Sequence, residues 1–326
     1  MRPFIAFLLA FLPMVGSWAQ DWGLNWIRAP WANATEQVWF SRSFSLNDMP
    51  QRARVEMASS GHFILYVNDY NVTTSLLEPF DQHGPDTIHV VSYDVRPFLR
   101  RGNNTLRVWF SPTCNSPKQL SLLLVADTGR KSLTLTTDGN WLCAPAHART
   151  YADGHEEVDG RFHITRPTPT ATWQPSQEVK KVNSSFRMPH FISHLPYEVR
   201  AYTCTMSEPD TTFSNVCTYR CGLRFEGRVR VTLTGMKAGD TLRINRHLYI
   251  CNGRDGEQAQ QRFVAGESGE VRIEGPAHFS SKNVEMVEAI LFRPQRVRGV
   301  RPYPAGHEAV FDDDPPVFLD LLPDED

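Results

Sequence analysis

Between Arg54 and Phe110, hydrophobic residues recur at every second position, and this pattern limits the fold more than any other feature of the chain. The alternation is clearest in residues 62–68 and 106–110. A period of two predicts β-strands with one buried face, and therefore a half-buried antiparallel sheet. Asn68-Asp69 and Arg101-Gly102-Asn103-Asn104 lie at the ends of these strands, where they favour turns with left-handed backbone.

Similar alternation returns later, at Val229, Val231 and Leu233 and again at Leu242 and Ile244. A mature chain of about 300 residues is long enough for two domains, each with its own core. We therefore predict an all-β fold of two jelly-roll-type antiparallel β-sandwiches. The expected boundaries are a signal peptide at 1–19, a first sandwich at 20–127, a connecting β segment at 128–171, a second sandwich at 172–293 and a disordered acidic tail at 294–326.

The first residues have the order of a secretory signal peptide: Arg2, an apolar run from Phe4 to Val15, and the small-residue site Ser17-Trp18-Ala19. The run is roughly twelve residues long, short of the roughly twenty that span a bilayer. We expect cleavage before Gln20 and a protein that is exported to the periplasm, to the cell surface or into the medium, without a membrane span.

A formal net charge of −2 gives no electrostatic reason to expect nucleic acid as a partner. Arg228, Arg230 and Arg243 alternate with apolar residues on expected strands. We therefore interpret them as part of solvent-exposed strand faces and not as a phosphate site.

Six cysteines in an exported protein favour disulfides. We expect a bridge among Cys204, Cys217, Cys221 and Cys251, joining either Cys204 to Cys217 or Cys221 to Cys251. Zinc is the alternative, because the spacing Cys217-x-x-x-Cys221 is tolerable for a metal site. Cys114 and Cys143 are either a further pair or small buried apolar residues.

Aromatic and polar residues near the expected sandwich edge and its long loop are candidates for sugar binding, because an aromatic face stacks on the apolar face of a pyranose. The candidates are Trp31, Tyr70, Asp81 and His83. The alternatives are tryptophans that fill the sandwich and a histidine at the surface. No cofactor is expected apart from calcium, for which Asp81, Asp86 and Asn71 offer oxygen ligands.

An acidic cluster consists of Glu156, Glu157 and Asp159, with Arg161 close by. Crowded carboxylates raise one another's pKa, as a general acid requires, whereas the arginine opposes that effect. A structural or metal-binding role in a connecting segment is the alternative to catalysis, and we favour it.

Several short motifs occur in a fixed order along the chain: Phe40-Ser41-Arg42-Ser43-Phe44, Leu65-Tyr66-Val67-Asn68-Asp69, Tyr93-Asp94-Val95, Gly102-Asn103-Asn104-Thr105-Leu106, Thr137-Asp138-Gly139-Asn140-Trp141 and His155-Glu156-Glu157-Val158-Asp159-Gly160-Arg161. Together they resemble the N-terminal β-sandwich domains of bacterial α-L-rhamnosidases, which have a galactose-binding-domain-like fold. The second half is less similar, since Arg228 replaces a family tryptophan.

The resemblance implies an exported carbohydrate-binding or accessory protein that recognises rhamnose-containing or other plant or bacterial glycans. The catalytic (α/α)₆ barrel of the family has no counterpart in these motifs, so we do not expect an enzyme. Two alternatives stay open. One is a structural or assembly protein whose Arg200–Cys221 region or acidic tail binds a protein partner. The other is a glycoside hydrolase whose activity is completed by a separate chain.

Overall fold

The computed structural model describes residues 25–31, 34–73, 75, 77–78, 89–112, 118–129, 131–162, 172–179, 190–193, 197–207, 215–222, 226–263, 266–267 and 269–294. Their regular structure consists of β-strands and two short 3-10 turns, η1 (Arg96–Phe98) and η2 (Ser281–Asn283). The all-β prediction is therefore confirmed. The expected signal peptide and acidic tail lie outside the described residues.

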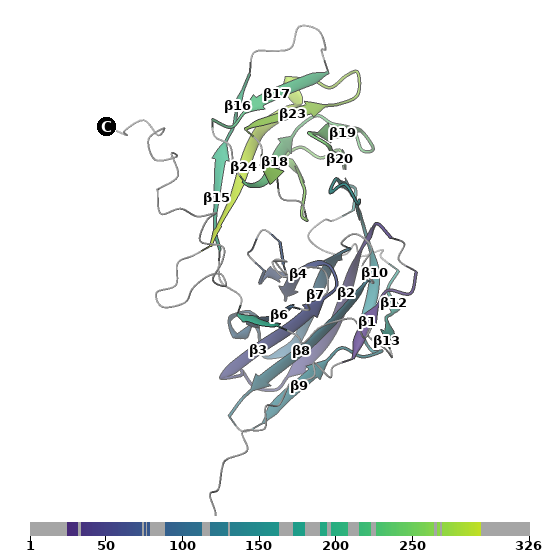
Figure 1. Cartoon of the computed structure of the whole chain (residues 1–326), viewed down its shortest axis with the longest axis vertical. Helices are drawn as coiled ribbons and strands as arrows, with labels where there is room; N and C mark the ends of the chain where they lie inside the picture. The colour runs from purple at the N-terminus through teal and green to yellow at the C-terminus, as the bar shows by residue number, and fades with distance from the viewer. Residues whose placement is uncertain are drawn as a thin grey trace, which may run out of the picture.

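The first unit, in the lower half of Figure 1, is a sandwich of two sheets. One sheet has the order β13 (Gln177–Val179), β1 (Trp26–Arg28), β8 (Gln119–Asp127), β3 (Arg52–Ser59), β6 (His89–Asp94) and β14 (His190–Ser193), with β9 (Ser132–Thr136) beside β8. The facing strands are β11 (Glu156–Asp159), β10 (Leu142–Thr150), β2 (Glu36–Leu46), β7 (Gly102–Ser111), β4 (His62–Val67) and β5 (Tyr70–Asn71), with β12 (Gln174–Pro175) beside β10.

Alternate residues of these strands build the first core, as the period of two predicts. Phe63, Leu65 and Val67 of β4 point into it, together with Val108 and Phe110 of β7. Trp141 also contributes to this core, and its indole N–H donates to the carbonyl of Thr136 at 3.0 Å. Burial of this tryptophan therefore leaves no indole N–H without a hydrogen-bond partner.

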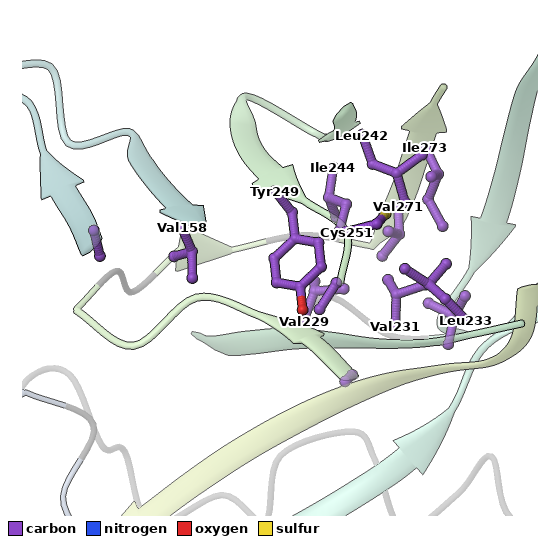
Figure 2. Packing of buried hydrophobic residues seen from close by; sticks show 14 of the residues in the cluster. Val158, Val229, Val231, Leu233, Leu242, Ile244, Tyr249, Cys251, Val271 and Ile273 are labelled. Atoms are coloured by element: carbon purple, nitrogen blue, oxygen red, sulfur yellow. The ribbon is translucent and has the colours of Figure 1, made fainter. Parts of the chain in front are cut away.

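The second unit contains two further layers. One is β15 (Tyr197–Thr203), β24 (Val284–Pro294), β18 (Glu226–Leu233) and β21 (Glu257–Gln260), with β22 (Gly266–Glu267) beside β18. The other is β16 (Thr205–Met206), β17 (Val216–Arg220), β23 (Glu270–Glu274), β19 (Thr241–Ile244) and β20 (His247–Ile250). Figure 2 shows Val231 and Leu233 of β18 facing Val271 and Ile273 of β23 across this core.

A single long sheet runs through both units, because β11 pairs in parallel with β20. Val158 lies beside Tyr249 in this pairing, and both side chains are buried in the second core (Figure 2). A Cβ at Gly160 would meet the Tyr249 hydroxyl and the Ile250 carbonyl, so only glycine fits at the end of β11.

The outer face of the first sandwich is not solvent-exposed where the units meet, in contrast to the half-buried sheet that the sequence predicts. Ile64, Tyr66 and Trp109 occupy the alternate positions and belong to the core of the second unit. The Trp109 ring stacks on Trp39 at 5.1 Å between centroids and meets the edge of Phe263 at 5.6 Å. The two units therefore share a continuous apolar contact.

Strands from the expected connecting segment and from the expected second sandwich also pair with strands of the first unit. β10, in the expected connecting segment, pairs with β2, while β12 and β13, in the expected second sandwich, pair with β10 and β1. β14 adds in parallel to β6. The described part of the first unit thus continues to Ser193, because these late segments complete the edges of its sheets.

Candidate functional site

The hairpin between β4 and β5 turns through Asn68 and Asp69, whose φ angles are 49° and 70°. Both residues are left-handed, as the sequence predicts, because short polar side chains tolerate this backbone at a two-residue hairpin turn. The turn places Tyr70 at the start of β5, where its side chain is 63% exposed. An exposed aromatic ring at a hairpin tip is available to a ligand.

Tyr70 is one wall of an open cleft of about 790 Å³. The lining residues come from the hairpin and from the segment around η1: Asn68, Asp69, Tyr70, Pro97, Phe98, Leu99 and Arg100. The Tyr70 and Phe98 rings are 6.1 Å apart between centroids and tilted by 39°. The cleft therefore combines an aromatic face with peptide and charged groups, the composition that sugar sites require.

A buried amide joins the two walls of the cleft. Asn104 is fully buried, and its Oδ1 accepts from Nδ2 of Asn68 at 2.7 Å and from the backbone N–H of Arg100 at 2.9 Å. Its Nδ2 donates to the carbonyls of Arg100 and Gly102 at 2.7 and 2.9 Å. Gly102 is left-handed, with a φ of 84°, as predicted for this turn.

Asn68 extends the same network. Its Nδ2 also donates to the Phe98 carbonyl at 2.9 Å, and its Oδ1 accepts from the backbone N–H of Thr105 at 3.0 Å. Every polar atom of the two amide groups thus has a partner, which fixes both side chains. This network therefore holds the backbone beside Tyr70 and at Phe98 in place.

Of the charged residues around the cleft, some form ion pairs and one does not. Asp69 forms an ion pair with Arg107, and Arg101 donates to Asp48 at 2.8 Å. Arg100 lines the cleft and donates from Nε to the Asn103 carbonyl at 2.9 Å. Among the described residues no carboxylate forms an ion pair with Arg100.

Of the other three sugar-binding candidates, Trp31 alone lies within the described residues, and it is not among the residues that line the cleft. Trp31 is partly buried and packs against the first core. Asp81 and His83 lie outside the described residues, as does Asp86 of the expected calcium site. Within the described ranges no group of three or more His, Cys, Asp or Glu residues has a geometry suited to a metal ion.

The acidic cluster is divided by its strand, because successive side chains of a β-strand face opposite sides. Glu156 is fully buried, whereas the Glu157 carboxylate accepts from the Tyr151 hydroxyl at 2.8 Å on the other face. Asp159 binds the Arg161 guanidinium through both oxygens, at 2.9 and 2.7 Å. Glu157 and Asp159 therefore share the face opposite Glu156, and each is bonded to a side chain of its own.

Glu156 instead connects the two units. One carboxylate oxygen accepts from Nε2 of Gln37 at 2.6 Å, and the other accepts from the backbone N–H of Arg262 at 2.7 Å. Burial raises the pKa of Glu156, and these hydrogen bonds oppose that shift. Burial also lowers the pKa of His247 to about 4, so its neutral Nδ1 accepts from the backbone N–H of Glu156 at 3.1 Å.

Arg228 belongs to the same junction, and the prediction that it lies on a solvated strand face is wrong. It is buried, and its guanidinium carbon lies 4.9 Å from the centroid of the Phe292 ring. Burial lowers the pKa of Arg228, while the Glu156 carboxylate opposes that shift. Arg230, two residues further along the same strand, pairs with Glu288 at 2.6 Å.

One disulfide is present among the described cysteines, and it joins Cys204 to Cys221. It falls within the expected four residues but differs from both expected pairings, because antiparallel β16 and β17 bring the residues that flank them together. Cys217 and Cys251 are free and buried, so they form neither a bridge nor the proposed zinc site. Cys143 is also free and buried, and burial raises its pKa to about 12. Cys114 lies outside the described residues.

Of the residues at this cleft, Tyr70 is a candidate from the sequence, whereas Phe98, Arg100 and Asn104 are not. A signal was present for Asn104, because an asparagine two residues after a turn glycine often bonds to the local backbone.

No helix in the described part of the chain has the length and apolar character needed to cross a membrane.

Residues 48–190 match the family model described as the alpha-L-rhamnosidase N-terminal domain. No curated protein matches the chain by sequence. Three solved structures share its fold: the alpha-L-rhamnosidase of Dictyoglumus thermophilum (18% identity, TM-score 0.68), that of Aspergillus terreus (17%, 0.67), and that of Streptomyces avermitilis complexed with L-rhamnose (17%, 0.65).

These matches cover 84%, 84% and 80% of the present chain. They cover only 36%, 36% and 29% of the respective enzymes, so the chain spans about a third of their length. The resemblance predicted from the motifs is confirmed, and this chain resembles the N-terminal β-sandwich part of the α-L-rhamnosidases, with residues 48–190 matching the N-terminal domain of that family.

Proposed function

We propose that this chain is an exported accessory protein that binds glycans in the cleft beside Tyr70. The observation that carries the proposal is an aromatic ring, 63% exposed, beside a cleft whose walls are joined by the hydrogen bond between Asn68 and the buried Asn104. Tyrosine at such a position supplies apolar contact to the C–H face of a sugar at a small entropic cost. The relationship to α-L-rhamnosidases, one of them complexed with L-rhamnose, supports rhamnose-containing glycans as the ligand class.

The expected affinity is modest. A sugar exchanges well-hydrated hydroxyls for protein hydrogen bonds with a small net gain, and the cleft is open to solvent. A dissociation constant around 0.1–1 mM corresponds to about 4–5 kcal/mol of binding free energy. Such weak sites serve to keep a protein near its polymeric target when several sugar units are bound in succession.

Isothermal titration calorimetry with L-rhamnose and rhamnose-containing oligosaccharides tests the proposal. Tyr70→Ala removes the ring and is expected to weaken binding at least tenfold, whereas Tyr70→Phe keeps the stacking face and retains most of the affinity. Leu142→Ala is the matched control, because Leu142 is also exposed but does not line the cleft. If the unmodified chain shows no binding to any rhamnose-, galactose- or pectin-type glycan in a panel, the proposal is refuted.

A protein partner is the second candidate, and one feature favours it. Within the described residues β15 pairs with β24 alone and is the last strand of its sheet. Val199 on β15 and Met206 on β16 are each 49% exposed. Pull-down with the unmodified chain and with a Val199→Lys variant tests this candidate, because a charge at a strand edge opposes β-strand addition.

A further inference from the structure

We propose that Arg100 gives the Tyr70 cleft a preference for glycans that carry a carboxylate, that is, for uronic acid units. The inference rests on the proposed function, because it names the ligand class of the same cleft. Its basis is an arginine that lines the cleft and forms no ion pair with the described carboxylates.

The backbone of Arg100 is fixed on both sides of its peptide unit. Its N–H donates to Oδ1 of Asn104, and its carbonyl accepts from Nδ2 of the same residue. The side chain is also oriented, because Nε donates to the Asn103 carbonyl at 2.9 Å. A guanidinium held in this way loses less rotamer entropy on binding a ligand than a free surface arginine does.

The remaining donors of Arg100 suit a carboxylate. A guanidinium has five N–H donors, and the contact to Asn103 uses only the one on Nε. The two terminal nitrogens are therefore left to bind both oxygens of a carboxylate end-on, which is a bidentate geometry.

The other charges at the cleft do not cancel this preference. Asp69 is the only carboxylate among the described lining residues, and it is already paired with Arg107. The neighbouring Arg101 is paired with Asp48 and does not line the cleft. An anionic sugar stacked on Tyr70 thus meets one uncompensated positive charge, and the interaction is weakened by salt because the site is exposed.

The test compares an oligogalacturonide trimer with its fully methyl-esterified form, in which neutral methyl esters replace the carboxylates. Titration calorimetry at low and physiological salt is expected to show about threefold to fivefold tighter binding of the acid, the size of a solvent-exposed ion pair. Arg100→Gln should abolish this preference, so that the acid and the ester bind with equal affinity. Arg101→Gln is the matched control and should keep the preference.

A sulfated galactose oligosaccharide separates carboxylate recognition from general attraction to anions. Three results would each overturn the inference, provided that neutral sugars still bind. The unmodified chain could bind acid and ester equally well, or it could bind the sulfated sugar more tightly than the acid. The preference for the acid could also survive Arg100→Gln. Failure of the proposed function looks different, because then acid, ester and L-rhamnose all show no binding.

Discussion

Nδ2 of Asn68 donates to Oδ1 of Asn104 at 2.7 Å, and this bond joins the tip of one hairpin to the start of another strand. The two residues are 36 positions apart in the sequence, yet their amides satisfy each other and the backbone between them. The consequence is a cleft with preorganised walls, since Tyr70 follows the first asparagine and Arg100 is bonded to the second.

Replacing Asn104 with alanine is expected to destabilise the fold by about 2–3 kcal/mol, because the backbone N–H of Arg100 loses its acceptor and the Asn68 amide loses one of its two acceptors. Chemical denaturation measures this change. Asn103→Ala is the matched control, because Asn103 is exposed and offers Arg100 only its carbonyl; it should stay within about 0.5 kcal/mol. Equal effects of the two substitutions would show that the buried network contributes little.

Glu156 is expected to make stability depend on pH. Burial raises its pKa above the ordinary 4.5, so the folded chain holds this proton more tightly than the unfolded chain does. Its favourable contribution is therefore complete below pH 4.5 and is lost as the pH rises through the folded-state pKa. Urea unfolding at pH 4.5 and 7.5 measures the difference in unfolding free energy between Glu156→Gln and the unmodified chain. This difference should shift in favour of Glu156→Gln at the higher pH.

Two further variants define the role of Glu156. Glu156→Ala removes the acceptor of one Gln37 N–H and of the Arg262 backbone N–H, and it should cost about 3 kcal/mol near pH 7. Glu157→Gln is the control, because that side chain lies on the opposite face and can still accept from the Tyr151 hydroxyl. A difference between the unmodified chain and Glu156→Gln that stays the same at both pH values would contradict the raised pKa.

The bridge between Cys204 and Cys221 closes a loop with a sequence separation of 17, which on the chain-entropy model stabilises the fold by about 3 kcal/mol. Cys204→Ser should lower the unfolding free energy by about this amount, and reduction of the unmodified chain should have the same effect. Thiol titration of the unreduced, denatured chain should find Cys143, Cys217 and Cys251 reactive. Peptide mapping that joins Cys217 to any of the other cysteines would contradict this pairing.

Local patterns in the sequence predicted the first sheets and the turn at Asn68-Asp69, because a period of two and left-handed asparagine are properties of short segments. The burial of Ile64 and Trp109 on the other face was not predictable in this way. It depends on a second unit that covers the sheet, and alternation alone cannot distinguish an outer face from one buried by a distant part of the chain.

Glu156 and Arg228 illustrate the same limit for charged residues. Charged side chains are rarely buried, so their sequence pattern favours solvent exposure. Glu156 nevertheless shares its strand face with the buried Val158, and this period of two was the available signal. The partners that make the burial tolerable, such as Gln37 and Arg262, lie more than a hundred residues away and become neighbours only in the fold.

The most direct test of glycan binding beside Tyr70 is a nuclear magnetic resonance titration of the ¹⁵N-labelled chain with L-rhamnose, because it locates the ligand as well as detecting it. The expected result is saturable shifts of the backbone amides of Asp69, Tyr70, Phe98 and Arg100, all of which line the cleft, and their loss in Tyr70→Ala. Saturable shifts confined to another surface, such as that around Trp31, or no shifts at millimolar sugar, would contradict the account.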